Sequence, residues 1–86
     1  MVSLTLEITN PTGLHMRPGT QFVQLAKTFA CDIQVRKGDK AETAKSLLRL
    51  MKIGISQGDT IELVCDGHDE QQAIDSLRDY IANLKE

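Results

Sequence analysis

The chain has 86 residues, of which 41% are hydrophobic and 26% charged, a balance typical of one globular domain and too apolar for general disorder. Its net charge of −2 argues against nucleic acid as a partner, because phosphate backbones attract proteins with a clear basic excess. No apolar run approaches the ~20 residues of a membrane span, and the first residues lack the pattern of a secretory signal. We therefore expect a single domain over residues 1–86, located in the cytoplasm and without membrane insertion.

The first half of the chain predicts two strands separated by a helix. Hydrophobic and polar residues alternate over residues 2–9, which is typical of a strand with one buried face. Turn-forming residues follow at 10–13, and the apolar residues of 18–29 then recur at the spacing of three and four that predicts an amphipathic helix. Pro18 suits the first turn of that helix, because an N–H at that position has no intrahelical acceptor. Alternation returns at 31–36 and predicts the second strand.

Two shorter elements and another strand come next. Residues 37–39 predict a hairpin turn, and the charged residues of 40–43 fit a weak strand at a sheet edge, where charge discourages pairing with other chains. Ser46 is expected to cap a short helix that ends at Gly54. The alternating residues 60–65 predict the last strand.

The final helix has the clearest pattern. Apolar residues from Ala73 to Leu84 form one stripe over three turns, and Asp69 with Gln72 predicts a capping box at the start of the helix. Strands that alternate in this way are buried on one face only, which indicates an antiparallel sheet whose buried face the helices cover. We therefore predict an α+β fold: a two-layer open-faced sandwich with a four-stranded antiparallel sheet and three helices on one face.

Outside one short segment, the residues able to carry chemistry have structural interpretations. Cys31 and Cys65 are far apart and lack a C-x-x-C spacing, so we interpret them as buried, unreactive thiols and expect no metal site and no cofactor. His68 precedes the last helix without a neighbouring arginine, and we interpret it as an exposed residue without a chemical role.

The segment Gly13-Leu14-His15-Met16-Arg17-Pro18 places a histidine immediately before a helix. The first turn of a helix has N–H groups without intrahelical acceptors and the positive end of the helix dipole, so it attracts anions. Arg17 adds a cation two residues from His15, and these positive surroundings favour the neutral imidazole, which is a nucleophile toward phosphorus. The residues thus suit a histidine that accepts and releases a phosphoryl group. They are equally compatible with a histidine that only caps the loop or the helix.

The same six residues resemble the phosphohistidine signature of the HPr family, the small phosphocarriers of the bacterial phosphoenolpyruvate-dependent sugar phosphotransferase system. Lys45-Ser46-Leu47 resembles the second signature of that family, and the resemblance covers the whole chain. It implies a phosphoryl carrier that is not an enzyme. His15 would accept a phosphoryl group on Nδ1 from phosphorylated enzyme I and pass it to IIA domains of sugar transporters. Arg17 would stabilise the phosphate, and the backbone N–H groups of Met16 and Arg17 would donate to it.

The resemblance also implies a regulatory site and a partner surface. Ser46 resembles the serine that a dedicated serine kinase phosphorylates in some bacteria. An apolar patch beside basic residues suits an acidic partner, and we expect the protein to bind its partners as a monomer. The expected members of the partner surface are Met16, Thr20, Lys27, Lys45, Leu47, Leu48, Arg49 and Met51. Met16 and Gly19 replace the Ala or Thr usual in the family, which leaves the choice of partners open.

Two other functions remain as alternatives. A regulatory HPr paralogue would act by phosphorylation-dependent binding and would not supply a transporter. A small ferredoxin-like module could bind metal or RNA, but the missing C-x-x-C motif and an aromatic content of only 3% disfavour it.

Overall fold

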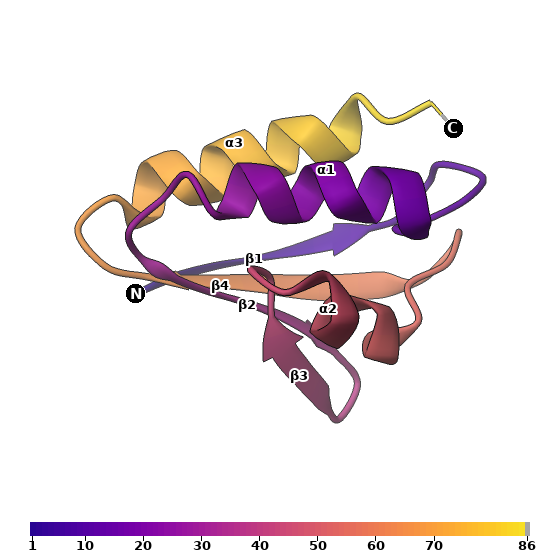
Figure 1. The fold of residues 1–86 in the computed structure, drawn as a ribbon, viewed down its shortest axis with the longest axis horizontal. Helices are drawn as coiled ribbons and strands as arrows, with labels where there is room; N and C mark the ends of the chain where they lie inside the picture. The colour runs from indigo at the N-terminus through magenta and orange to yellow at the C-terminus, as the bar shows by residue number, and fades with distance from the viewer. Residues whose placement is uncertain (86) are drawn as a thin grey trace.

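The computed structural model describes residues 1–85 and shows a four-stranded sheet with three helices (Figure 1). The elements are β1 (Val2–Glu7), α1 (Met16–Ala26), β2 (Asp32–Lys37), β3 (Lys40–Thr43), α2 (Leu47–Ile53), β4 (Thr60–Asp66) and α3 (Glu70–Ala82). The strand order is β1-β4-β2-β3, and every neighbouring pair is antiparallel. Helices α1 and α3 run in opposite directions across one face, and α2 packs beside α1 and β3 (Figure 1). The predicted α+β open-faced sandwich is confirmed.

One hydrophobic core lies between the sheet and the helices. The inward side chains of the two central strands are at most 1% exposed: Ile33 and Val35 in β2, and Ile61 and Leu63 in β4. Phe22 of α1 is fully buried against them. Burial of this alternating set of side chains is the main driving force for the fold, and it also explains why the local sequence pattern predicted these strands.

Helix α1 differs from its prediction at both ends. It begins at Met16, two residues before Pro18, and it ends at Ala26, so Phe29 lies outside the helix. The N–H groups of Thr28 and Phe29 donate to the carbonyl oxygens of Leu25 and Ala26, three residues earlier, at N···O distances of 3.0 and 3.2 Å. These tighter bonds end the α-helical spacing. Phe29 still packs against the core from the connection that follows the helix.

The predicted capping box at α3 is wrong. Asp69 occupies the N-cap position, but its side chain makes no capping hydrogen bond. Its carboxylate instead accepts the N–H groups of Ala30 (2.8 Å) and Cys31 (2.9 Å) at the start of β2. Glu70, not Gln72, makes the local bond, since its carboxylate accepts the N–H of Gly67 at 3.0 Å. The Asp69 carboxylate therefore binds two N–H groups of a distant segment and not the N–H groups of its own helix. The sequence of the helix alone does not indicate these two donors.

The loss of stability as pH falls below about 4 is expected to depend on Asp69. The Ala30 N–H, followed by the thiol and N–H of Cys31, holds the pKa of Asp69 below its ordinary range. A carboxyl group whose pKa is lower in the folded state stabilises the protein above its unfolded-state pKa of about 4, and this stability is lost as pH falls through the folded value. Asp69→Asn should therefore lower Tm at pH 7 and flatten the fall of Tm between pH 5 and about pH 2.

The control for this experiment is Asp39→Asn, because Asp39 is an exposed aspartate in the turn between β2 and β3. Thermal denaturation at a series of pH values measures both variants. An Asp69→Asn curve parallel to the wild-type curve would show that the carboxylate charge does not contribute.

The two cysteines have the buried positions expected of them. Cys31 and Cys65 are free thiols that are at most 2% exposed. Burial raises the pKa of Cys31 to about 12 and also raises the pKa of Cys65, so neither supplies a reactive thiolate near neutral pH. Within residues 1–85, no group of three or more His, Cys, Asp or Glu side chains could hold a metal ion. None of the helices in that range is long and apolar enough to cross a membrane.

Candidate functional site

The loop before α1 is held in one conformation by short-range and long-range hydrogen bonds. The side-chain amide of the buried residue Asn10 donates to the carbonyl of Gly13 (2.8 Å), and the N–H of Leu14 donates to Ile55 (3.2 Å). Gly13 has a φ of 62°, and a Cβ at this position would lie 2.7 Å from Cα of Ser56 and would collide with the carbonyl oxygen of Ile55. The loop therefore needs glycine for its backbone angle and for its close approach to the connection after α2.

His15 is the N-cap residue of α1, but its imidazole does not cap the helix. Its backbone is extended (φ −78°, ψ −164°), its carbonyl accepts the N–H of Gly19 at 2.6 Å, and its side chain makes no capping hydrogen bond. The imidazole is exposed. The structure thus disfavours the interpretation that His15 only caps the helix, and leaves its ring accessible to a partner.

The first turn of α1 gives the surroundings of His15 a positive potential. Met16 and Arg17 occupy the first two helical positions, where a helix provides no acceptor for the N–H groups. Pro18 has no N–H, and the Gly19 N–H is already bonded to His15. The first turn contains no acidic residue, so nothing within it offsets the positive end of the helix dipole. An anion beside His15 would meet the two N–H groups of Met16 and Arg17.

Helix α2 completes the surroundings of the imidazole. His15 lines a surface hollow together with Leu14, Met16, Met51, Gly54 and Ile55. The hollow therefore joins the start of α1 to the end of α2. A Cβ on Gly19 would lie 3.1 Å from the Leu14 carbonyl oxygen and 3.4 Å from Cδ1 of Leu47. The absence of a side chain at Gly19 therefore lets the loop, α1 and α2 approach closely.

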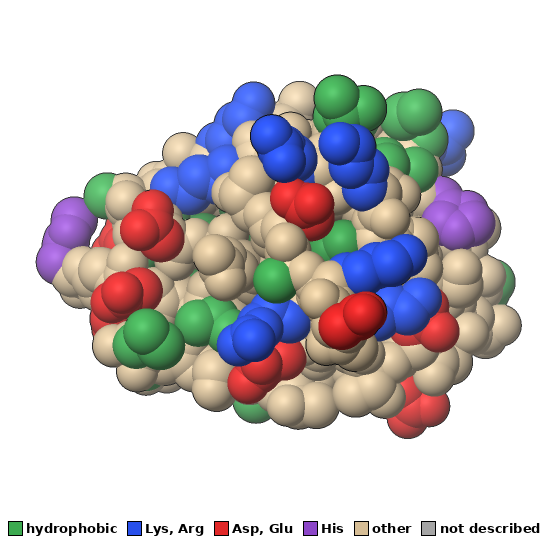
Figure 2. Space-filling view, turned by 90° about the horizontal axis from the view of Figure 1, so that it is seen from below, with side chains coloured by type: hydrophobic (Ala, Val, Ile, Leu, Met, Phe, Trp, Pro, Cys, Tyr) green, Lys and Arg blue, Asp and Glu red, His purple; other side chains and the backbone are tan. Residues whose placement is uncertain are grey.

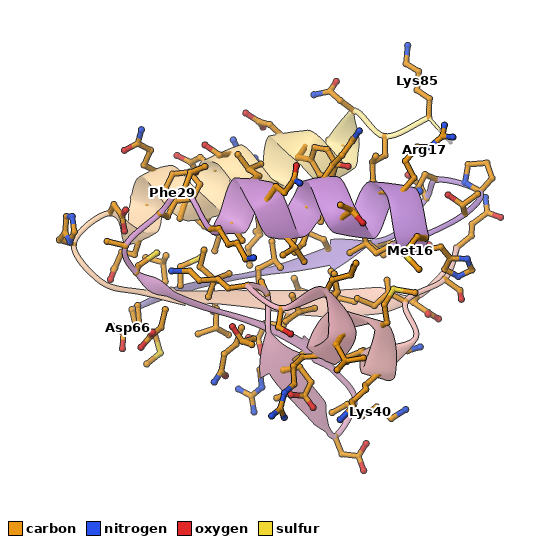
Figure 3. All side chains as sticks on the ribbon, viewed as in Figure 1. Met16, Arg17, Phe29, Lys40, Asp66 and Lys85 are labelled. Atoms are coloured by element: carbon orange, nitrogen blue, oxygen red, sulfur yellow. The ribbon has the colours of Figure 1, made fainter. Side chains whose placement is uncertain are left out.

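Arg17 lies on the other side of the first turn. Its side chain lines a second hollow with Gln21, Asn83, Leu84 and Lys85, between α1 and the end of α3. Figure 3 shows Arg17 directed toward Lys85, whereas Met16 leaves α1 on the side of α2. The structure therefore places Met16 beside His15, as expected, and places the Arg17 guanidinium next to the C-terminal segment.

The hydrophobic residues of α2 divide between the core and the surface. Leu50 and Ile53 are buried and Leu47 is half-buried, whereas Leu48 is 72% exposed. Two methionines are exposed nearby, Met16 (64%) and Met51 (36%). We call Met16, Leu48 and Met51 the α1–α2 patch. Figure 2 shows exposed hydrophobic side chains gathered at one edge of the molecule with Lys and Arg side chains beside them. Leu48 and Met51, two apolar members of the expected partner surface, are therefore exposed.

Thr20, Lys45 and Arg49 of the expected partner surface contact neighbouring groups, and Lys27 is exposed. Lys27 follows the last residue of α1 and is exposed, and Lys45 donates from Nζ to the carbonyl of Phe29 at 2.7 Å. Both therefore lie toward the opposite end of α1 from His15. Arg49 pairs with Glu42 at 3.6 Å. The Thr20 hydroxyl donates to the Met16 carbonyl at 2.6 Å inside α1.

Ser46 is the N-cap of α2, as predicted. Its hydroxyl accepts the N–H of Arg49 at 3.4 Å, and Gly54 ends the helix with a φ of 71°. The hydroxyl is half-buried and lies next in sequence to Lys45. His68, in contrast, is exposed in the connection before α3, and the two histidines lie at opposite ends of the molecule (Figure 2).

Three residues that shape the site were missed in the sequence. Asn10 could have been recognised, because asparagine often bonds to the backbone of its own turn. Ile55 could not have been recognised, since its carbonyl accepts the N–H of Leu14, which lies 41 residues away in sequence. The hydroxyl of Tyr80 reaches the first turn of α1 from α3, and nothing local to Tyr80 predicts this contact.

Comparison with known proteins identifies the family of this chain. The family model described as the PTS HPr component phosphorylation site matches residues 2–83. Phosphocarrier protein HPr of Haemophilus influenzae is 42% identical over 85 residues, which cover 99% of this chain and 100% of that protein. HPr-like protein Crh of Halalkalibacterium halodurans is 41% identical over 81 residues, which cover 94% of this chain and 96% of that protein.

A solved structure shows the same fold. HPr-C-His from Thermoanaerobacter tengcongensis superposes with a TM-score of 0.93 at 45% identity, covering 95% of this chain and 92% of that one. The sheet topology, the exposed histidine at the start of α1 and the match of the family model over nearly the whole chain lead to one conclusion. This protein belongs to the HPr family of phosphocarriers of the phosphotransferase system.

Proposed function

We propose that this phosphocarrier accepts a phosphoryl group on Nδ1 of His15 from phosphorylated enzyme I and passes it to IIA domains of sugar transporters. The observation that carries the proposal is the exposed imidazole at the N-cap of α1, which makes no capping bond. A bond from Nδ1 to phosphorus forms while the bond from phosphorus to the donor group of enzyme I breaks. In the second transfer, the bond from Nδ1 to phosphorus breaks while a bond from phosphorus to the acceptor group of the IIA domain forms. This step restores the imidazole of His15. The protein carries the group in stoichiometric amounts and is not itself a catalyst.

The first turn of α1 stabilises the phosphorylated state in this proposal. The N–H groups of Met16 and Arg17 donate to phosphoryl oxygens, and the positive end of the helix dipole offsets part of their charge. The guanidinium of Arg17 supplies a positive charge on the neighbouring side of the same turn, where Lys85 adds another. An arginine can bind two phosphoryl oxygens at once, which an ammonium group cannot do with the same geometry.

Partner binding uses the α1–α2 patch, and Lys27 and Lys45 extend this surface toward the far end of α1. The patch adjoins the hollow that contains His15, so a partner docked there reaches the imidazole. The positive charges of Lys27, Lys45 and Arg49 favour an acidic surface on enzyme I and on IIA domains. The site lies within one chain, which suits a monomer, and the free thiols of Cys31 and Cys65 suit the reducing conditions of the cytoplasm.

The proposal is tested by incubating the purified protein with phosphoenolpyruvate and enzyme I and measuring its intact mass. We expect the mass to increase by one phosphoryl group. Addition of a IIA domain should then return the protein to its original mass. A protein that remains at its original mass in the first step, with an active enzyme I, would contradict the proposal.

A regulatory paralogue is the second candidate function, because the similarity to an HPr-like protein Crh (41%) nearly equals the similarity to an HPr (42%). Such a protein would act through phosphorylation-dependent binding. The second step of the same experiment separates the two functions. Rapid loss of the phosphoryl group to a IIA domain supports a carrier, whereas a phosphorylated protein that keeps its group in the presence of IIA domains supports a regulator.

Phosphorylation of Ser46 by a serine kinase is part of the proposal and would act as a negative switch. A phosphate at the N-cap of α2 is compatible with the helix dipole, so the helix is expected to persist. The added charge of about −1.5 to −2 would partly cancel Lys45 and Arg49 and would repel an acidic partner.

Ser46→Asp is expected to reduce the rate of phosphorylation by enzyme I roughly tenfold at low salt, through weaker association, with little change in Tm. The matched control is Ser46→Asn, since Asn caps a helix as well as Asp does but adds no charge. Rates measured over a range of enzyme I concentrations and at two salt concentrations provide the test. High salt should narrow the difference between Ser46→Asp and the wild type. Equal slowing by both variants would assign the effect to the helix cap and not to charge.

A further inference from the structure

Tyr80 connects α3 directly to the first turn of α1. Its hydroxyl oxygen lies 3.0 Å from the carbonyl oxygen of Pro18 and 3.0 Å from Oε1 of Gln21, across 62 and 59 residues of sequence. Its ring also contacts the ring of the fully buried Phe22, with centroids 6.2 Å apart and planes inclined by 48°. One half-buried side chain therefore contacts Pro18, Gln21 and Phe22, which lie in the first two turns of α1.

This contact lies at the start of α1, which has no side-chain cap. An N-cap side chain normally accepts an N–H of the first turn and stabilises the start of the helix, but His15 makes no such bond. The hydroxyl of Tyr80 supplies a tertiary hydrogen bond to this turn from a helix whose inner face is buried in the core.

The order of this turn matters for transfer because it carries the N–H groups of Met16 and Arg17. Hydrogen-bond donors stabilise charge in a transition state only when they are held in place before the reaction. A first turn that frays would swing these donors away from phosphoryl oxygens on His15. The Tyr80 hydroxyl opposes such fraying from the far side of the helix, where it does not contact the α1–α2 patch.

We infer that Tyr80 is a positioning residue for phosphoryl transfer: its hydroxyl holds the first turn of α1 so that the backbone donors beside His15 stay aligned. The inference rests on the proposed function of His15. It assigns to Tyr80 an effect on the rate of transfer within the complex and none on the binding of enzyme I.

The test is Tyr80→Phe, which removes the hydroxyl and keeps the ring against Phe22. With the carrier as the varied substrate of enzyme I, we expect kcat to fall roughly three- to tenfold, the effect of one ordinary hydrogen bond, while KM stays unchanged. Amide hydrogen exchange followed by NMR should accelerate by a similar factor at the start of α1 and stay unchanged in α2.

Thr28→Val is the matched control, because the Thr28 hydroxyl also donates to a carbonyl of α1, that of Leu25 at 2.7 Å, but at the opposite end of the helix. It should leave kcat and the exchange of the first turn unchanged. Tyr80→Phe with a wild-type kcat, or with a loss confined to KM, would overturn the inference, and so would equal slowing by Thr28→Val. Failure of the proposed function would look different, since the wild-type protein itself would then take no phosphoryl group from enzyme I.

Discussion

His15→Ala is expected to reduce phosphorylation of the protein by enzyme I and phosphoenolpyruvate to background, while His68→Ala leaves it at the wild-type level. His15 is the exposed N-cap of α1, whereas His68 is exposed at the opposite end of the molecule before α3. Since neither side chain belongs to the core, both variants should keep the fold. The two substitutions are thus matched in chemistry and exposure and differ in location.

The phosphoryl group that the wild-type protein takes from enzyme I should also have the properties of a phosphohistidine. A bond between phosphorus and an imidazole nitrogen is a phosphoramidate, which is expected to be labile in acid and stable in base. Intact mass before and after a brief acid treatment checks this behaviour, and circular dichroism checks that His15→Ala remains folded. Labelling that persists in a folded His15→Ala protein would refute the assignment of the acceptor.

Gly13→Ala is expected to lower the stability of the protein much more than Gly38→Ala. Backbone strain at a φ of 62° and the collision of the new Cβ with the Ile55 carbonyl together should cost roughly 2–4 kcal/mol. Neither obstacle can move cheaply, because both the carbonyl of Ile55 and the Cα of Ser56 belong to the backbone. For a domain of this size the loss corresponds to a fall in Tm of roughly 10–20 °C.

Gly38→Ala is the control that separates strain from collision. Gly38 has nearly the same φ, 60°, but a Cβ there would have no heavy atom within 4 Å. Its substitution should therefore cost only about 1 kcal/mol, from the left-handed backbone angle. Thermal and urea denaturation of the two variants measure the difference. Equal losses at Gly13 and Gly38 would mean that the contact with Ile55 does not constrain the loop before His15.

Local patterns in the sequence were sufficient for most of the architecture. Alternation placed β1, β2 and β4 within about two residues of their observed ends, since the buried face of β2 and β4 follows the period of two directly. The short strand β3 was expected from the hairpin turn before it and from its charged residues. Ser46 was recognised as a cap because capping acts between residues three apart. The place of His15 just before a helix could be predicted for the same reason, and this place already suggested phosphoryl chemistry.

The interactions that hold the site together could not be read from the sequence. The carboxylate of Asp69 accepts the N–H groups of Ala30 and Cys31, which lie 39 and 38 residues away in sequence. The predicted capping box at α3 is wrong because of these two bonds. The Arg17 side chain lies with the end of α3, although its sequence position suggested only that it would lie near His15.

The sequence by itself thus determined the order of the elements, the buried face of each strand and the position of His15 before a helix, because these depend on neighbours within one or two turns of chain. Only the tertiary structure decided how the loop that carries His15, the proposed acceptor, is held. Gly13 needs the backbone of Ile55 beside it, and the first turn of α1 needs the Tyr80 hydroxyl from α3. Such contacts form when distant segments pack together to bury the core, and their geometry depends on the whole fold, so no local pattern of residues encodes them.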